Sequence, residues 1–102
     1  MGQRRYPPLT GSEIAAILVA MGFKKVRTES SHEHYECPAG NGYPRSVVTL
    51  DTNYRDFDDD RIKTMIRQSN RSREVFYGAT KGTARKASVP HIKLITPATD
   101  PE

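Results

Sequence analysis

Two histidines stand two residues apart in the segment SSHEHYEC, and this spacing decides which chemistry they can share. The imidazole titrates near neutral pH, so an accessible histidine can take up or release a proton under working conditions. On a strand, residues two apart point to the same face, which places His32, His34 and Glu36 together. Tyr35 and Cys37 suit a face that helices cover. The pattern therefore predicts that both histidines lie on the open face of a sheet, and it does not choose between them.

Histidines and basic residues of this kind are sufficient for one reaction, the cleavage of RNA. Its own 2′-hydroxyl can attack the adjacent phosphate, so an enzyme needs a proton acceptor and positive charge but no metal. Lys24, Lys25 and Arg27 belong to a neighbouring predicted strand and are near enough in the sequence to supply that charge. Two surface histidines without any role remain the plain alternative.

Other chemistries have weaker support in the sequence. A His-x-His pair with His91 or Glu36 as a third ligand is a weak zinc pattern. Cys37 and His34 are expected on opposite sides of one strand, which argues against a thiol–imidazole pair. The chain has no Gly-rich phosphate loop, and the acidic run DFDDDR lacks the spacing of a calcium loop and fits a helix cap. The sequence therefore predicts neither a metal nor a cofactor.

Length and composition fit one small domain with a modest core. The chain has 102 residues, of which 35% are hydrophobic, and no tryptophan. A single cysteine excludes an intramolecular disulfide and a Cys-based zinc site. The first residues form no signal-type apolar run, and no segment approaches the roughly 18 apolar residues of a membrane span. We therefore expect a cytoplasmic protein without a membrane contact.

Charge is distributed unevenly along the chain. Residues 1–28 carry five Lys/Arg against one acidic residue, residues 29–60 carry eight Asp/Glu against two arginines, and residues 61–102 carry nine Lys/Arg against three acidic residues. Two basic blocks thus flank an acidic middle. Such blocks favour a polyanionic partner, although solvated helix faces give the same pattern.

The elements that must position the histidines begin with a helix. Thr10 and Glu13 form the Thr-x-x-Glu capping box, and Leu9 and Ile14 are spaced for a hydrophobic staple across it. Apolar residues recur at helical spacing up to Met21, and Gly22 supplies the left-handed residue that ends a helix.

Three strands and a second helix are predicted next. The strands cover residues 23–29, with Phe23 and Val26 as apolar anchors, then residues 30–37 and residues 46–51. Asn41 and Gly42 form the strongest hairpin signal between the second and third strands. The second helix covers residues 61–70, and the three aspartates before it suit its cap and first turn.

This order, α-β-β-β-α over residues 9–70, predicts an α+β two-layer sandwich with an antiparallel sheet. Residues 1–8 are expected to form a flexible lead-in. Residues 71–102 are expected to form a C-terminal extension that is partly helical, with a short helix interrupted by Gly78 and Gly82, and then extended or disordered.

Three motifs of this segment match one known family. They are Gly-Phe at the end of the first helix, Ser31-His32 at the start of the second strand, and Ile-x-x-x-Ile-Arg-Gln in the second helix. With them, residues 9–70 resemble the HicA family of bacterial toxins. These are small mRNA interferases with an α-β-β-β-α fold like that of double-stranded-RNA-binding domains.

The resemblance implies a metal-independent endoribonuclease with His32 as its catalytic residue. His34, which shares the same predicted face, is the secondary candidate. RNA contacts are then expected from Lys24, Lys25, Arg27 and Ser31. The expected partners are an mRNA substrate and a HicB-like antitoxin that covers the active site, with DNA contacted only through the antitoxin.

Two residues depart from the family pattern next to the candidate site. Ser30 stands where the family usually has glycine, which permits unusual backbone angles. Glu29 stands where a basic residue is common, and its charge repels phosphate while favouring a protonated His32. Reduced or altered activity is therefore one expectation.

Two other functions fit the same sequence. A non-catalytic RNA-binding module would use the basic helices to bind RNA by shape and phosphate contacts. A protein-interaction module would use the acidic middle and the basic C-terminal block to dock a partner.

Overall fold

The first helix of the computed structural model, which describes residues 5–92, is α1 (Gly11–Ala20). Thr10 caps it as predicted: its side chain accepts a hydrogen bond from the Glu13 backbone, and the Glu13 carboxylate accepts one from the Thr10 N–H at 2.9 Å. Gly22 follows the helix with φ 99°, so the predicted left-handed end is also confirmed.

The central sheet has three antiparallel strands in the order β2 (Lys24–Glu29), β3 (His32–Cys37) and β4 (Ser46–Asp51). Ser30 and Ser31 make the two-residue turn between β2 and β3. In the loop before β4, Asn41 and Gly42 have φ of 50° and 84° and are flanked by the Gly40–Tyr43 bridge, which confirms the predicted turn.

The prediction that Val26 anchors β2 in the core is wrong. The register of β2 against β3 shifts between Lys25 and Arg27, so Val26 is the extra residue of a β-bulge. Val26 is 51% exposed, whereas Phe23, directly before the strand, is buried as expected. A bulge of this kind depends on the partner strand and leaves no signal in the sequence of one strand.

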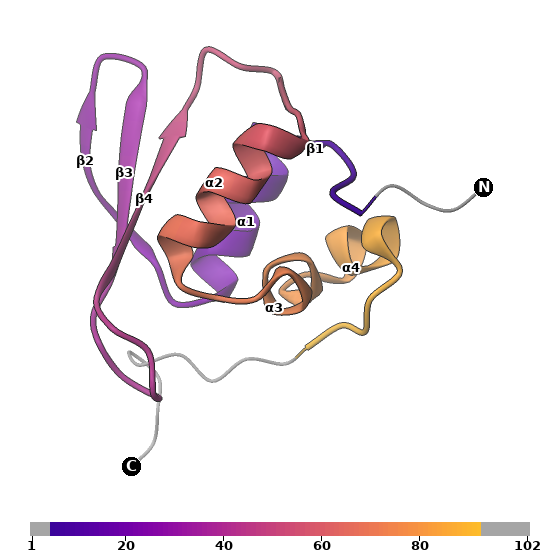
Figure 1. Ribbon diagram of the computed structural model, residues 1–102. Coiled ribbons are helices and arrows are strands. Elements are labelled where there is room, and N and C mark those ends of the chain that lie inside the picture. The colour runs from indigo at the N-terminus through magenta and orange to yellow at the C-terminus, as the bar shows by residue number, and fades with distance from the viewer. Residues whose placement is uncertain (1–4, 93–102) are drawn as a thin grey trace.

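Register divides the sheet into two faces. Tyr35 and Cys37 of β3 and Val48 and Leu50 of β4 are buried against the helices. The other face, which we call the open face, carries His32 and the residues that alternate with it. Helices α1 and α2 lie on the covered side of the sheet (Figure 1).

Helix α2 (Asp59–Ser69) begins after Asp58, whose side chain accepts a hydrogen bond from the Arg61 N–H, so the predicted acidic cap is confirmed. Before α2, the short strand β5 (Asp56–Phe57) pairs with β1 (Leu9–Thr10) at the start of the chain. This two-stranded sheet was not predicted, because two-residue strands are too short to show a period.

Residues after Ser69 add two more helices, α3 (Arg73–Gly78) and α4 (Lys81–Ala87). Gly78 ends α3, but Gly82 lies inside α4 and does not interrupt it. Phe76 and Tyr77 are fully buried and belong to the same hydrophobic cluster as the residues of α1, β3 and β4. Helices α3 and α4 lie beyond α1 and α2 on the side away from the sheet (Figure 1).

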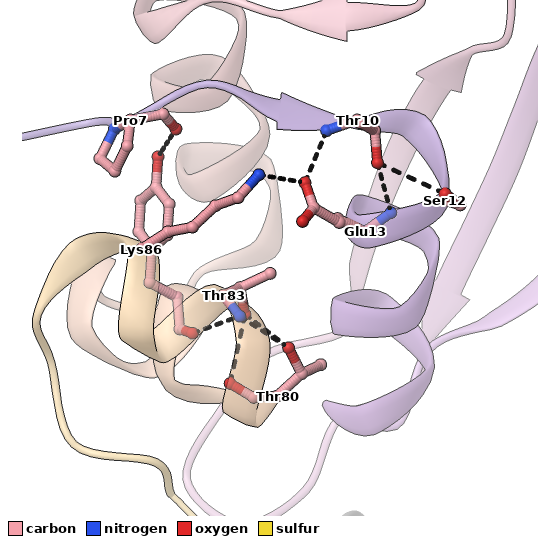
Figure 2. A network of polar contacts seen from close by, with 8 residues as sticks. Pro7, Thr10, Ser12, Glu13, Thr80, Thr83 and Lys86 are labelled. Atoms are coloured by element: carbon pink, nitrogen blue, oxygen red, sulfur yellow. Dashed lines mark hydrogen bonds and ion pairs between the residues drawn. The ribbon is translucent and has the colours of Figure 1, made fainter.

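A polar network ties α4 to the start of α1 (Figure 2). The Lys86 ammonium donates to the Glu13 carboxylate at 2.8 Å, so the N-terminal capping box is also held from α4. The Tyr77 hydroxyl donates to the Pro7 carbonyl at 2.7 Å. Residues 1–4 of the predicted flexible lead-in and residues 93–102 of the predicted disordered tail lie outside the described residues.

The predicted α+β class with an antiparallel three-stranded sheet is confirmed. Between residues 5 and 92, no helix is long and apolar enough to cross a membrane.

Candidate functional site

His32 opens β3 directly after the two-residue turn, and its side chain is 51% exposed. The residue opposite it in the register is Asp51, the last residue of β4. The His32 Nε2 and the Asp51 Oδ2 lie 3.4 Å apart, within ion-pair range but too far for a short hydrogen bond. The structure thus gives His32 an acidic neighbour while leaving half of its side chain open to solvent.

The Asp51 carboxylate is fixed by the loop that follows β4. The Asn53 backbone N–H donates to Oδ1 at 2.9 Å, and this hydrogen bond is the main cause that lowers the pKa of Asp51. Reduced hydration of the carboxylate acts in the opposite direction. A hydrogen bond with Ser31 and the charges of His32 and Arg61 lower the pKa further. Asp51 is therefore a stable anion beside His32 at neutral pH.

Ser31, predicted to contact RNA, links the turn to the same loop. Its carbonyl accepts hydrogen bonds from the Thr52 N–H at 2.8 Å and the Thr52 hydroxyl at 3.1 Å. Its hydroxyl accepts one from the Asn53 side-chain amide at 3.0 Å. The structure thus assigns Ser31 a role in holding the turn against the end of β4.

His34 lies on the same face as His32, as strand alternation predicted, but its surroundings differ. Its Nδ1 is 3.1 Å from the Thr49 hydroxyl, its Nε2 is 3.2 Å from the Glu29 carboxylate, and its side chain is only 16% exposed. Both ring nitrogens are therefore occupied. A proton transfer at His34 would first have to break one of these contacts, so His32 is the more accessible of the two histidines.

The three predicted phosphate contacts divide between the two faces. All three side chains are exposed. Register places Lys24 opposite Glu36 and Arg27 opposite His34, on the open face, but it places Lys25 opposite the buried Tyr35. Arg27 and Lys24 therefore share a face with His32, and Lys25 does not.

A cleft of about 610 Å³ opens beside His32, between β4 and α2. Helix α2 runs along the edge of β4, where the Thr49 N–H donates to the Gln68 side chain at 3.3 Å. His32, Thr49 and Asp51 form the sheet wall of the cleft, and α2 with the loop before it forms the other. Sequence reasoning missed this cleft, because it exists only where two elements meet in the folded chain.

The α2 side of the cleft combines an aromatic platform with acidic groups. Tyr54 and Phe57 come from the loop and from β5, and Asp58, Asp60 and Arg61 from the start of α2. By their place in the sequence, the three aspartates of this run are predicted to cap the helix and fill its first turn. Asp58 does cap α2, but Asp60 also lines the cleft.

The described part of the chain has neither a cluster of metal-ligating side chains nor an accessible thiol. No group of three His, Cys, Asp or Glu residues in it is arranged to hold a metal ion. His91 is exposed and lies in the segment after α4, outside the sheet. Cys37 is fully buried, with its sulfur 3.7 Å from the Arg71 guanidinium, and it faces away from His34.

No family model, curated protein or solved structure matches this chain.

Proposed function

We propose that this protein is a metal-independent endoribonuclease, an mRNA interferase of the HicA type with a fold like that of double-stranded-RNA-binding domains. The observation that carries the proposal is the environment of His32: a half-exposed imidazole, 3.4 Å from an anionic Asp51, at the mouth of a cleft. Apart from the two-residue strands β1 and β5, the element order from α1 through β2, β3 and β4 to α2 agrees with the proposed fold.

In the proposed reaction, neutral His32 accepts the proton of a ribose 2′-hydroxyl. The 2′-oxygen forms a bond to the adjacent phosphorus, the bond from phosphorus to the 5′-oxygen of the next nucleotide breaks, and that oxygen takes up a proton from solvent. The products are a 2′,3′-cyclic phosphate and a free 5′-hydroxyl. The imidazolium that forms is stabilised by Asp51, which is the role of a carboxylate beside a general base.

Positive charge for the scissile phosphate is available on the same face of the sheet from Arg27 and Lys24. Glu29, one of the two residues that depart from the family pattern, has close partners in the structure. Its carboxylate lies 3.3 Å from the Arg27 guanidinium and 3.2 Å from His34. Its repulsion of an incoming phosphate is therefore smaller than the sequence alone suggested.

The same proposal includes the regulatory partner and the location. A HicB-like antitoxin would inhibit the enzyme by covering His32 and the cleft. Contact with DNA would come through the antitoxin, and the toxin would act on mRNA in the cytoplasm.

Cleavage of a defined RNA in the presence of EDTA tests this function. We expect products that end in a 2′,3′-cyclic phosphate, and no cleavage at a site where the ribose is replaced by 2′-deoxyribose. Cleavage that requires a divalent cation, or that proceeds at the 2′-deoxy site, would contradict the mechanism.

A non-catalytic RNA-binding module is the second candidate, and α4 favours it. Lys81, Arg85 and Lys86 are exposed on this short helix, far in sequence from His32. Such a module predicts binding that weakens steeply with salt while the RNA stays intact. Substituting Lys81 and Arg85 by alanine would then abolish binding, whereas the enzyme hypothesis expects cleavage to depend on His32.

A further inference from the structure

The cleft beside His32 has a size and a composition that suit a flat polar ligand. Its volume of about 610 Å³ is within the usual range of small-molecule sites. Its walls carry three aspartates against one arginine, so the interior is acidic and disfavours a phosphate. A nucleic acid that reaches His32 would therefore keep its backbone outside the cleft and place a neutral base inside it.

An aromatic and guanidinium stack forms one wall of the cleft. The Arg61 guanidinium lies 4.0 Å from the centre of the Tyr54 ring, and Phe57 meets the same ring edge-to-face at 5.7 Å between centres. Tyr54 is 40% exposed, and the Arg61 side chain is 42% exposed. Unpaired RNA bases stack on such aromatic and guanidinium planes in single-stranded recognition.

The acidic groups of the cleft are not equivalent. The Asp58 carboxylate already accepts a hydrogen bond from the Arg61 N–H and pairs with the Arg61 guanidinium, both at 3.1 Å. Among residues 5–92, none forms a hydrogen bond or ion pair with the Asp60 carboxylate; the Thr64 hydroxyl donates to the Asp60 backbone carbonyl instead. Asp60 is thus the acceptor that the fold leaves available in the cleft.

Guanine matches this acceptor better than the other bases. A carboxylate has two acceptor oxygens and no donor. The Watson–Crick edge of guanine presents two adjacent donors, N1–H and the N2 amino group. The same edge of adenine or cytosine presents one amino group beside an acceptor nitrogen, and that of uracil one N–H between two carbonyls.

We propose that the cleft between β4 and α2 is a base-recognition subsite that binds guanine, stacked on the Tyr54–Arg61 pair with its edge on Asp60. Resting on the proposed function, this inference assigns the base to the nucleotide whose 2′-hydroxyl attacks, because His32 lines the same cleft. It predicts cleavage after guanosine.

Two measurements test the inference, one of which needs no catalysis. The first is the affinity for guanosine 3′-monophosphate compared with the adenosine, cytidine and uridine 3′-monophosphates, measured by calorimetry. The second is cleavage of DNA oligonucleotides that each contain one ribonucleotide, which is G, A, C or U. We expect guanosine to be preferred in both by about tenfold, the usual worth of a bidentate base contact.

Asp60→Asn is the informative variant, and Asp59→Asn is its matched control. Both remove one negative charge from the first turn of α2, but only Asp60 lines the cleft. We expect Asp60→Asn to abolish most of the guanosine preference and Asp59→Asn to retain it. Circular dichroism of both variants checks that α2 remains folded.

The outcomes separate this inference from the nuclease proposal. His32-dependent cleavage with equal rates after all four bases, or equal behaviour of the two variants, would overturn the base subsite and leave the nuclease standing. Guanosine-selective binding that Asp60→Asn abolishes, without any cleavage of RNA, would support the subsite and remove the nuclease. Affinity that does not distinguish the four nucleotides would overturn the subsite.

Discussion

Gly78, the last residue of α3, lies against the backbone of the segment that follows α4. A Cβ at this position would be 2.6 Å from the Pro90 carbonyl oxygen and 3.2 Å from two atoms of the Ile92 side chain. The Ile92 N–H also donates to the Gly78 carbonyl at 2.8 Å, so the two segments are held together. Gly78→Ala therefore forces the backbone at Pro90 to move.

The two contributions to the free energy of unfolding have opposite signs. Added volume in a well-packed region destabilises by about 1–3 kcal/mol. Alanine is favoured over glycine in a helix by about 0.5–1 kcal/mol, which offsets part of that loss. We expect a net destabilisation of about 1–2 kcal/mol for Gly78→Ala, since the clash is with backbone and cannot be relieved by a side-chain rotation.

Gly82→Ala is the matched control four residues away. Gly82 is the second residue of α4, and a Cβ there would meet no atom within 4 Å. This variant should gain about 0.5–1 kcal/mol from the helix preference alone. Urea unfolding followed by circular dichroism measures both changes. A Gly78→Ala protein as stable as the wild type would refute the packing of residues 90–92 against α3.

Three further changes test the core, the turn and one carboxylate. Phe76→Ala should lose about 3–5 kcal/mol in urea unfolding, against less than about 0.5 kcal/mol for the exposed Val19→Ala; similar losses would contradict a core that includes α3. Ser30→Gly should gain about 0.5–1 kcal/mol, because Ser30 has φ 57°, and a loss of stability would contradict this. Burial raises the pKa of Glu13, but hydrogen bonds with Lys86 and with the Thr10 backbone N–H lower the pKa more, so that it lies below the ordinary glutamate value of 4.5. The folded protein should therefore lose stability as the pH falls below 4.5. Glu13→Gln should remove that dependence, and an unchanged pH profile would contradict the contribution of this carboxylate.

The parts of the fold that local chemistry determines were predictable. The capping box of α1, the left-handed Gly22 and the Asn41–Gly42 turn each follow from a few adjacent residues, and the structure has all three. The bulge at Val26 and the pairing of β1 with β5 depend on residues distant in the sequence. No single segment carries their signal.

For the candidate site, too, only the features set by adjacent residues were predictable from the sequence. Strand alternation placed His32 and His34 on one face, as the register shows. The difference between them comes from Asp51, Thr49 and Glu29, which only the pairing of three strands brings next to the imidazoles. Periodicity within one strand therefore found the face but not the more accessible histidine.

RNA cleavage by His32→Ala and His34→Ala, measured side by side with the wild type, is the decisive test of whether His32 is a general base. A general base contributes about 10²- to 10⁴-fold to a rate, so His32→Ala should lose at least about a hundredfold in kcat/KM. His34→Ala should retain most of the activity, provided that circular dichroism shows both variants folded. Equal RNA cleavage by His32→Ala and the wild type would contradict the proposed role of His32.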